Sequence, residues 1–184
     1  MKRKIALLGL LVLSLMTMVG CSASAELVAF IDQFTASTNH QMVLSMYSSA
    51  EGFVTLTYQV DGNKSFTGNS SDPTADTFTY YNNGTTYIYT QDEDSATWIK
   101  ESVTEELNSI FDIASEMVAI DFQKTGDDEF TLKSSHLSEY EMESFVIVLN
   151  DDGAVFTIVA DGIEMTITIS EFGNISLTLP AVAE

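Results

Sequence analysis

Three stretches of the chain alternate apolar and polar residues at every second position, and this alternation constrains the fold more than any other feature. The stretches are VTLTYQV (54–60), IEMTITI (163–169) and ISLTL (175–179). Because successive side chains of a β-strand point to opposite faces, strict alternation indicates strands with one buried and one wet face. We therefore expect an antiparallel sheet that is covered on one side.

Short glycine-containing turns separate the expected strands. They are VDGNK (60–64), YNNGTT (81–86), NDDGAV (150–155), VADGIE (159–164) and EFGN (171–174). Asp-Gly and Asn-Gly pairs supply the positive φ angles that tight hairpins need. Consecutive hairpins predict an antiparallel meander, and the sequence has room for about 10–11 strands.

Two segments place apolar residues at helical spacing. The first runs from Glu26 to Phe34, and its apolar stripe consists of Leu27, Phe30, Ile31 and Phe34. The second has one apolar face made of Val103, Leu107, Ile110, Phe111, Ala114, Met117 and Val118. Ser102 and Glu105 fit a capping box at its start. The expected order is one helix, five or six strands, a long helix, and about five strands, which is an α+β fold.

Residues 1–20 have the layout of a secretory signal, with Lys2, Arg3 and Lys4 ahead of an uncharged run from Ile5 to Val19. As a helix this run spans about 22 Å, at about 1.5 Å per residue. A bilayer core is about 30 Å thick and needs about 20 residues. We therefore expect a processed signal rather than a permanent membrane span.

Cys21 is the only cysteine and ends the stretch MVGC, which looks like a lipobox. An exported chain with one cysteine has no internal disulfide to form, so lipid modification of Cys21 is the favoured interpretation. The alternative is ordinary cleavage after ASA, at Ala25, which would discard the cysteine. In the lipoprotein interpretation, residues 1–20 are the signal, residues 21–25 are the lipidated cysteine with a short spacer, and residues 26–184 form one domain.

The charge balance also favours a place outside the cytoplasm. Three of the seven basic residues lie in the signal, which leaves four lysines against 27 acidic residues and a formal net charge of −23 from Cys21 onward. Nucleic-acid binding is excluded, because it depends on Lys and Arg that neutralise phosphates. The spacer from Ser22 to Ala25 reaches about 14 Å when extended. That exceeds a Debye length of about 8 Å, so we expect a body held off the outer face of the cell membrane by a lipid anchor.

Two segments resemble a known family. They are NNGTTYIYTQDEDSATWIKESVTEEL (82–107) and MTITISEFGNISLTLP (165–180). Their hairpin and aromatic patterns are similar to those of the lipoprotein carrier LolA, the mycobacterial lipoproteins LppX and LprG, and many lipoproteins of Gram-positive bacteria without an assigned function. The resemblance implies a strongly curved, unclosed half-barrel with the two helices on its concave side. In characterised relatives that concavity holds acyl chains or the lipid of a lipoprotein. The cavity arginine associated with the LolA carrier has no counterpart here, so carriage of lipoproteins is not expected.

Aromatic, aliphatic and methionine side chains of the expected strands and second helix provide a candidate lining for an apolar ligand. They are Val54, Leu56, Tyr58, Phe78, Tyr80, Tyr87, Tyr89, Trp98, Leu107, Phe111, Met165 and Ile167. The alternative is that these side chains pack on the helices and leave no cavity. The first interpretation gives a lipid-binding protein, and the second gives an interaction or sensor module of the same fold.

We find no pattern for catalysis or tight metal binding. His40 and His136 are the only histidines, neither stands at metal-ligand spacing, and no G-x-S-x-G motif occurs. We expect both histidines to be exposed at strand ends. The acidic clusters at residues 92–94, 127–129 and 151–152 are interpreted as charge at turns, with a weak calcium site between adjacent turns left open. Alternating glutamates in SEYEMES (138–144) suggest the wet face of an edge strand. We therefore expect a monomeric, non-enzymatic protein without catalytic residues, cofactor or structural metal.

Overall fold

A computed structural model of the chain describes residues 23–48, 52–92, 95, 97–103 and 118–182. Its helices are α2 (Ala25–Ala36) and α4 (Ser134–Glu139), with short 3-10 turns η1 (Pro73–Ala75) and η2 (Ala119–Asp121). Its strands are β1 (Asn39–Ser48), β2 (Gly52–Asp61), β3 (Lys64–Asn69), β4 (Thr77–Asn82), β5 (Thr85–Gln91), β6 (Trp98–Val103), β7 (Phe122–Lys124), β8 (Glu129–Leu132), β9 (Ser144–Asn150), β10 (Gly153–Ala160) and β11 (Ile163–Ser170).

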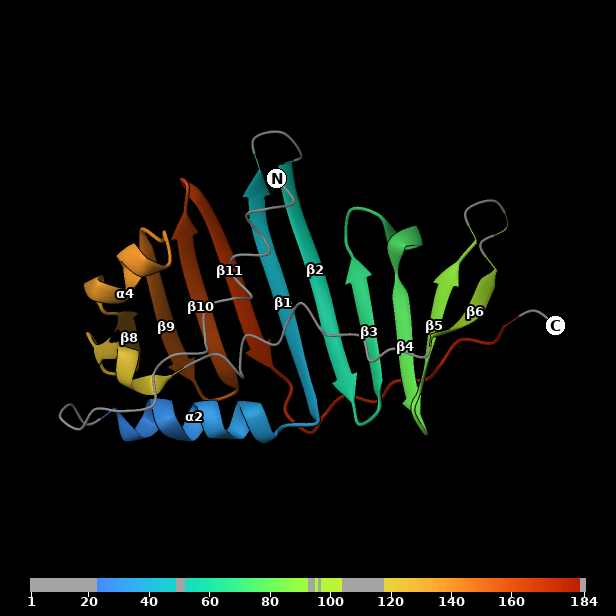
Figure 1. The fold of residues 1–184 in the computed structure, drawn as a ribbon, viewed down its shortest axis with the longest axis horizontal. Helices are drawn as coiled ribbons and strands as arrows, with labels where there is room; N and C mark the ends of the chain where they lie inside the picture. The colour runs from blue at the N-terminus through green and yellow to red at the C-terminus, as the bar shows by residue number, and fades with distance from the viewer. Residues whose placement is uncertain (1–22, 49–51, 93–94, 96, 104–117, 183–184) are drawn as a thin grey trace.

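The described strands form one open sheet in the order β6-β5-β4-β3-β2-β1-β11-β10-β9-β8-β7, with antiparallel neighbours throughout (Figure 1). The pairing of β1 with β11 joins two meanders, one from each part of the chain. The expected α+β class, unclosed antiparallel sheet and strand number are confirmed. The strong curvature and the position of the helices on a concave side remain predictions.

Helix α2 lies across one end of the sheet, beneath the half that contains β9, β10 and β11 (Figure 1). Its buried residues are Leu27, Phe30, Ile31 and Phe34, which are the four expected from the sequence. Burying them contributes about 6–12 kcal/mol before the entropy of ordering the chain is subtracted. The rings of Phe30 and Phe156 meet edge to face at 6.1 Å, and Phe145 contacts Phe156 at 5.8 Å. The helix is therefore fixed on the sheet by aromatic packing.

The register shows that the apolar side of the sheet changes between β2 and β3. Residues opposite each other on antiparallel strands point to the same face. One row across the sheet consists of Phe130, Ile147, Phe156, Ile167, Leu44 and Leu56, and its next member, on β3, is Asn69. A row on the other face consists of Gln41, Gln59, Phe66, Phe78, Tyr89 and Lys100. We call the first face the core face, because its side chains pack against α2, and the second the outer face.

The expected strand ISLTL is wrong, because residues 174–181 form no strand and instead cross the ends of β1, β2 and β3. Hydrogen bonds from side chains, rather than from a neighbouring strand, hold this segment. Asn39 donates from Nδ2 to the Ile175 carbonyl and accepts at Oδ1 from the Ile175 amide, both at 2.8 Å. The Leu177 amide donates to Asp61 at 3.0 Å, and Lys64 donates to the Leu177 carbonyl at 2.8 Å. We call residues 173–177 the C-terminal strap.

Two further expectations are corrected. Ser102 and Val103 were expected in the long helix, but they belong to β6, where they pair with Tyr87 and Thr86 of β5. Residues 104–117, which include the remainder of that expected helix apart from Val118, lie outside the described residues. Val118 itself is the residue before η2.

The expected edge strand in SEYEMES is also wrong. Glu139 ends helix α4, Glu141 has a positive φ of 55°, and β9 begins only at Ser144. The physical reason is that Leu137 and Tyr140, three residues apart, both pack against the core, which favours a helical turn over an extended chain. No helix in the described part of the chain is long and apolar enough to cross a membrane.

Candidate binding cleft

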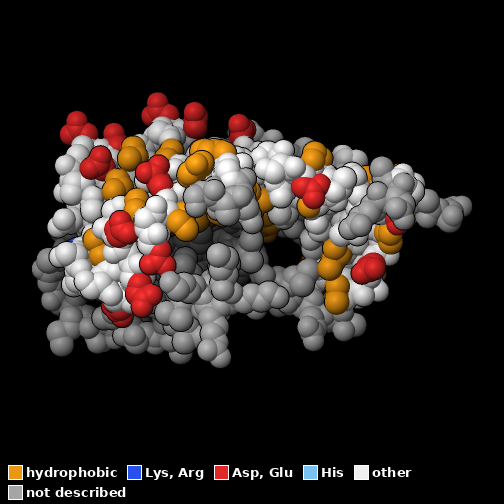
Figure 2. Space-filling view, turned by 90° about the horizontal axis from the view of Figure 1, so that it is seen from above, with side chains coloured by type: hydrophobic (Ala, Val, Ile, Leu, Met, Phe, Trp, Pro, Cys, Tyr) orange, Lys and Arg blue, Asp and Glu red, His pale blue; other side chains and the backbone are white. Residues whose placement is uncertain are grey.

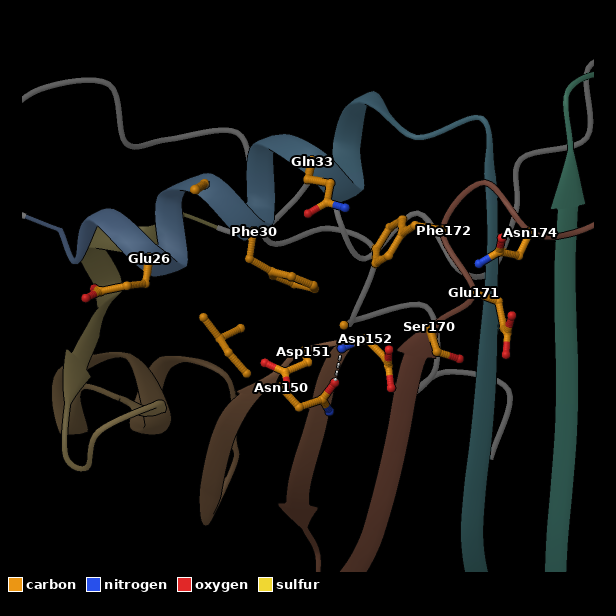
Figure 3. Close-up of a pocket in the computed structure, with 13 residues that line it drawn as sticks. Glu26, Phe30, Gln33, Asn150, Asp151, Asp152, Ser170, Glu171, Phe172 and Asn174 are labelled. Carbon is orange, nitrogen blue, oxygen red and sulfur yellow. Dashed lines mark hydrogen bonds between the residues drawn. The ribbon is translucent and has the colours of Figure 1, made fainter.

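A cleft of about 650 Å³ lies between α2, the β9–β10 turn and the end of β11 (Figure 3). Its lining residues are Glu26, Ala29, Phe30, Gln33, Leu149, Asn150, Asp151, Asp152, Gly153, Ser170, Glu171, Phe172 and Asn174. The volume falls in the range of about 300–1,000 Å³ that is common for ligand pockets. Side chains from three elements that are distant in sequence thus enclose one space.

The apolar part of the cleft is built mainly from two phenylalanines. Phe30 comes from the buried stripe of α2, and Phe172 follows β11 in the EFGN turn. Their rings meet edge to face at 6.4 Å, and Phe172 also lies 6.1 Å from the His40 ring. Leu149 and Ala29 complete this apolar wall. Because Phe30 and Phe172 also contact the core, the wall is held by packing that does not depend on a ligand.

The rim of the cleft carries four carboxylates. Asp151, Asp152 and Glu171 are exposed at the sheet end, and Glu26 is exposed on the first turn of α2 (Figure 3). A hydrogen bond from the Ser24 hydroxyl and the nearby Lys124, whose Nζ lies 3.4 Å from Glu26 Oε1, lower the pKa of Glu26. Glu26 is therefore ionised at neutral pH, and the rim attracts cations.

Local backbone geometry fixes the rim on the sheet side. The Asp152 amide donates to Asn150 Oδ1 at 3.0 Å and so closes the β9–β10 turn. Gly153 begins β10 so close to β11 that a Cβ atom at this position would lie 1.9 Å from the Ile169 carbonyl oxygen. Only glycine fits this approach. The positions of Asp151 and Asp152 beside β11 thus depend on glycine at position 153.

The structure does not bring the predicted ligand-lining residues around one space. Of those that lie in described strands, Val54, Leu56, Tyr58, Met165 and Ile167 share the core face. The others share the outer face and are Phe78, Tyr80, Tyr87, Tyr89 and Trp98. The sheet separates the two groups, and neither lines the cleft. Leu107, Phe111 and Cys21 lie outside the described residues.

The outer-face group forms an aromatic row of its own, which extends to Phe66. Phe66 and Phe78 lie 4.8 Å apart, and Phe78 meets Trp98 edge to face at 5.3 Å. The Lys100 Nζ stands 4.1 Å from the centroid of the Tyr87 ring, within cation–π range. We call Phe66, Phe78, Tyr80, Tyr87, Tyr89 and Trp98 the outer aromatic row.

The expectation that both histidines are exposed is wrong. His40 is only 7% exposed on β1 and packs edge to face on Phe34, at 5.1 Å, because the core face of β1 lies under α2. Its burial lowers its pKa, and a hydrogen bond with the Ser37 backbone opposes this effect. His136 lies in α4 with its ring nitrogens 3.4 Å from Asp121 and 3.6 Å from Glu139. These contacts give both histidines a structural role.

Acidic residues 127–128 and 151–152 lie in the connections between strands, as expected, whereas Glu129 of the cluster at 127–129 begins strand β8. Glu93 and Asp94 lie outside the described residues. In the part of the chain that the structure describes, no group of three His, Cys, Asp or Glu side chains is placed to hold a metal ion. The weak calcium site stays a prediction without a location.

Sequence reasoning missed the cleft. The sequence identified Phe30 as core and Asp151 with Asp152 as turn charge, but no pattern connected them. The one available signal was Phe172, an aromatic residue inside a short turn, where an apolar side chain needs a reason to be present. No family model and no curated protein sequence matches this chain.

Proposed function

We propose that this protein is an exported lipoprotein, anchored through Cys21 at the outer face of the cell membrane, which acts as a non-enzymatic interaction module. Its body is an open, LolA-like half-barrel whose core is filled by its own side chains. The lipobox-like MVGC, the short uncharged run before it and the net charge of −23 support the anchored, exported state.

The filled core face is the observation that favours an interaction module over a lipid carrier. Ile147 and Phe156 have no exposed surface, and Ile167 is 1% exposed. Ile167 belongs to the predicted ligand lining, yet it is packed between Leu44 and Phe156 at the centre of the sheet. An acyl chain on the described core face beneath α2 would have to displace these contacts. The cleft, in contrast, is open and its walls are supported from behind.

The anchor is tested by replacing the cysteine. Cys21→Ala should move the protein from the membrane fraction to the medium, and mass spectrometry of the wild-type N-terminal peptide should detect a diacylglycerol on Cys21. Retention of Cys21→Ala in the membrane would refute the anchor. An N-terminus at Glu26 in the wild-type protein would instead support cleavage after Ala25.

The second candidate function is binding of an apolar ligand, and the outer aromatic row is the observation that favours it. Phe66, Phe78 and Trp98 are half-buried rather than fully packed, and aromatic side chains bury a large apolar area when a ligand covers them. Native mass spectrometry of protein purified without organic solvent distinguishes the candidates. A retained lipid mass that is lost in Phe78→Ser would establish ligand carriage and displace the interaction module.

A further inference from the structure

We propose that the cleft binds a basic peptide segment of a partner protein, with a Lys or Arg side chain among the rim carboxylates and a neighbouring apolar side chain on Phe172. This inference rests on the proposed interaction function and specifies the chemistry of the partner. Three observations carry it: the contacts of the lysines, the composition of the cleft walls, and the number of residues between Cys21 and Glu26 in the sequence.

The lysines that follow the signal are already engaged. Lys64 binds the C-terminal strap, and Lys100 lies over Tyr87. Lys133 donates to the Ile120 carbonyl, and Lys124 pairs with Glu26. These are all four lysines after residue 20, and that part of the chain has no arginine. Any cationic side chain that pairs with the other three rim carboxylates therefore comes from another molecule.

Asp151, Asp152 and Glu171 carry that unmatched charge. Among the residues that the structure describes, none of these three forms an ion pair. All three are exposed on one side of the cleft, so they add their fields in one place (Figure 3). Figure 2, which views the end of the sheet opposite α2, shows acidic side chains there with hardly any basic ones visible, and the net charge of −23 from Cys21 onward gives the whole molecule a field that attracts cations.

The mixed walls favour a peptide over a simple cation. Phe30, Phe172 and Leu149 give the cleft an apolar side, which contributes nothing to binding a small hydrated ion. Lys and Arg carry long apolar stems below their charge, and Arg also stacks on aromatic rings. A segment that combines one such residue with an apolar neighbour uses both walls of the cleft.

The position of the cleft near the anchor adds a constraint on the partner. Glu26 follows Cys21 by five residues, which span at most about 18 Å when extended. A lipid-anchored molecule thus holds Glu26, at the α2 side of the rim, within about 18 Å of the membrane surface. The partner segment must then belong to a protein that lies close to the same surface.

The test uses the full-length protein in a non-ionic detergent and fluorescence anisotropy with synthetic peptides of alternating Lys and Phe. The Lys-Phe peptide should bind, its Glu-Phe counterpart should not, and a Lys-Ser peptide should bind at least tenfold more weakly. Asp151→Asn/Asp152→Asn should weaken Lys-Phe binding at least tenfold, because Asn keeps the turn and removes the charge.

A matched control separates a site from general attraction. Glu101→Gln/Glu164→Gln removes the same charge from exposed residues on β6 and at the start of β11, away from the cleft. An equal loss of binding in both double variants, no binding of the Lys-Phe peptide, or equal binding of spermine would each overturn the proposal. Peptide binding by a Cys21→Ala variant that stays in the membrane fraction would leave this inference intact while refuting the anchor.

Discussion

The C-terminal strap gives the sharpest test of how this sheet is held together. Asn39 makes three side-chain hydrogen bonds, two with the backbone of Ile175 and one at 3.2 Å with Asp61. Asn39→Ala removes all three and leaves the Ile175 amide and carbonyl without their partners. We expect the strap to detach in this variant while the sheet stays folded.

The size of the effect on strap opening follows from the number of hydrogen bonds between Asn39 and the strap. A hydrogen bond contributes about 0.5–1.5 kcal/mol net, so the two that join Asn39 to Ile175 contribute about 1–3 kcal/mol to keeping the strap closed, while the bond to Asp61 joins β1 to β2. Since about 1.4 kcal/mol corresponds to a factor of ten, the population of the open strap should rise roughly 5- to 150-fold. Leu177, which is only 8% exposed, then spends more time in water.

Hydrogen exchange measured at single amides by NMR checks this prediction. The informative amide is that of Leu177, because Asn39 does not bond to it directly and its acceptor, Asp61 Oδ2, is not the oxygen that Asn39 contacts. Asn69→Ala is the control, since the Asn69 side chain accepts a local bond from the Ser71 amide and does not contact the strap. Unchanged exchange at Leu177 in a folded Asn39→Ala protein would refute the idea that side chains act in place of a neighbouring strand.

Two further predictions concern the core. Burial lowers the pKa of His40 below 6.5, so the unfolded chain takes up a proton more readily than the folded protein. The contribution of His40 to the free energy of unfolding is therefore fully present above pH 6.5 and is lost as the pH falls below that value. Thermal unfolding of His40→Gln between about pH 7.5 and pH 5 should show a shallower decline than the wild type, and identical slopes would contradict this role of His40. Gly153→Ala forces a Cβ atom against the Ile169 carbonyl and should lower the free energy of unfolding by at least about 1–3 kcal/mol in a urea titration. A urea midpoint of Gly153→Ala equal to that of the wild type would show that β10 and β11 can move apart without loss of stability.

Local sequence patterns correctly predicted the elements whose formation depends on neighbouring residues. The four apolar residues of α2 are buried as expected, and the turns at Gly62, Gly84 and Gly162 have the positive φ that Asp-Gly and Asn-Gly pairs supply. These features depend on residues within one or two turns of each other. They required no knowledge of which strands become neighbours.

Which residues of each strand point to the core face, and which to the outer face, could not be predicted in the same way. Alternation shows that the two faces of a strand differ, but a change of one residue in register exchanges them. Leu56 of β2 and Phe66 of β3 both alternate correctly, yet they point to opposite faces because Leu56 is paired with Asn69 and Phe66 with Gln59. A ligand lining assembled from alternation alone therefore mixed two surfaces.

The strap and the cleft depend even more on tertiary structure. ISLTL has the pattern of a strand because its residues alternate between contact and solvent, but its hydrogen-bond partners are side chains more than 100 positions away in the sequence. The cleft unites Phe30, Asp151 and Phe172 for the same reason. The sequence by itself determined the first helix and the hairpin turns, since these arise from neighbouring residues. Which apolar face is buried, and where acidic and aromatic side chains meet, was decided by strand pairing across the whole chain.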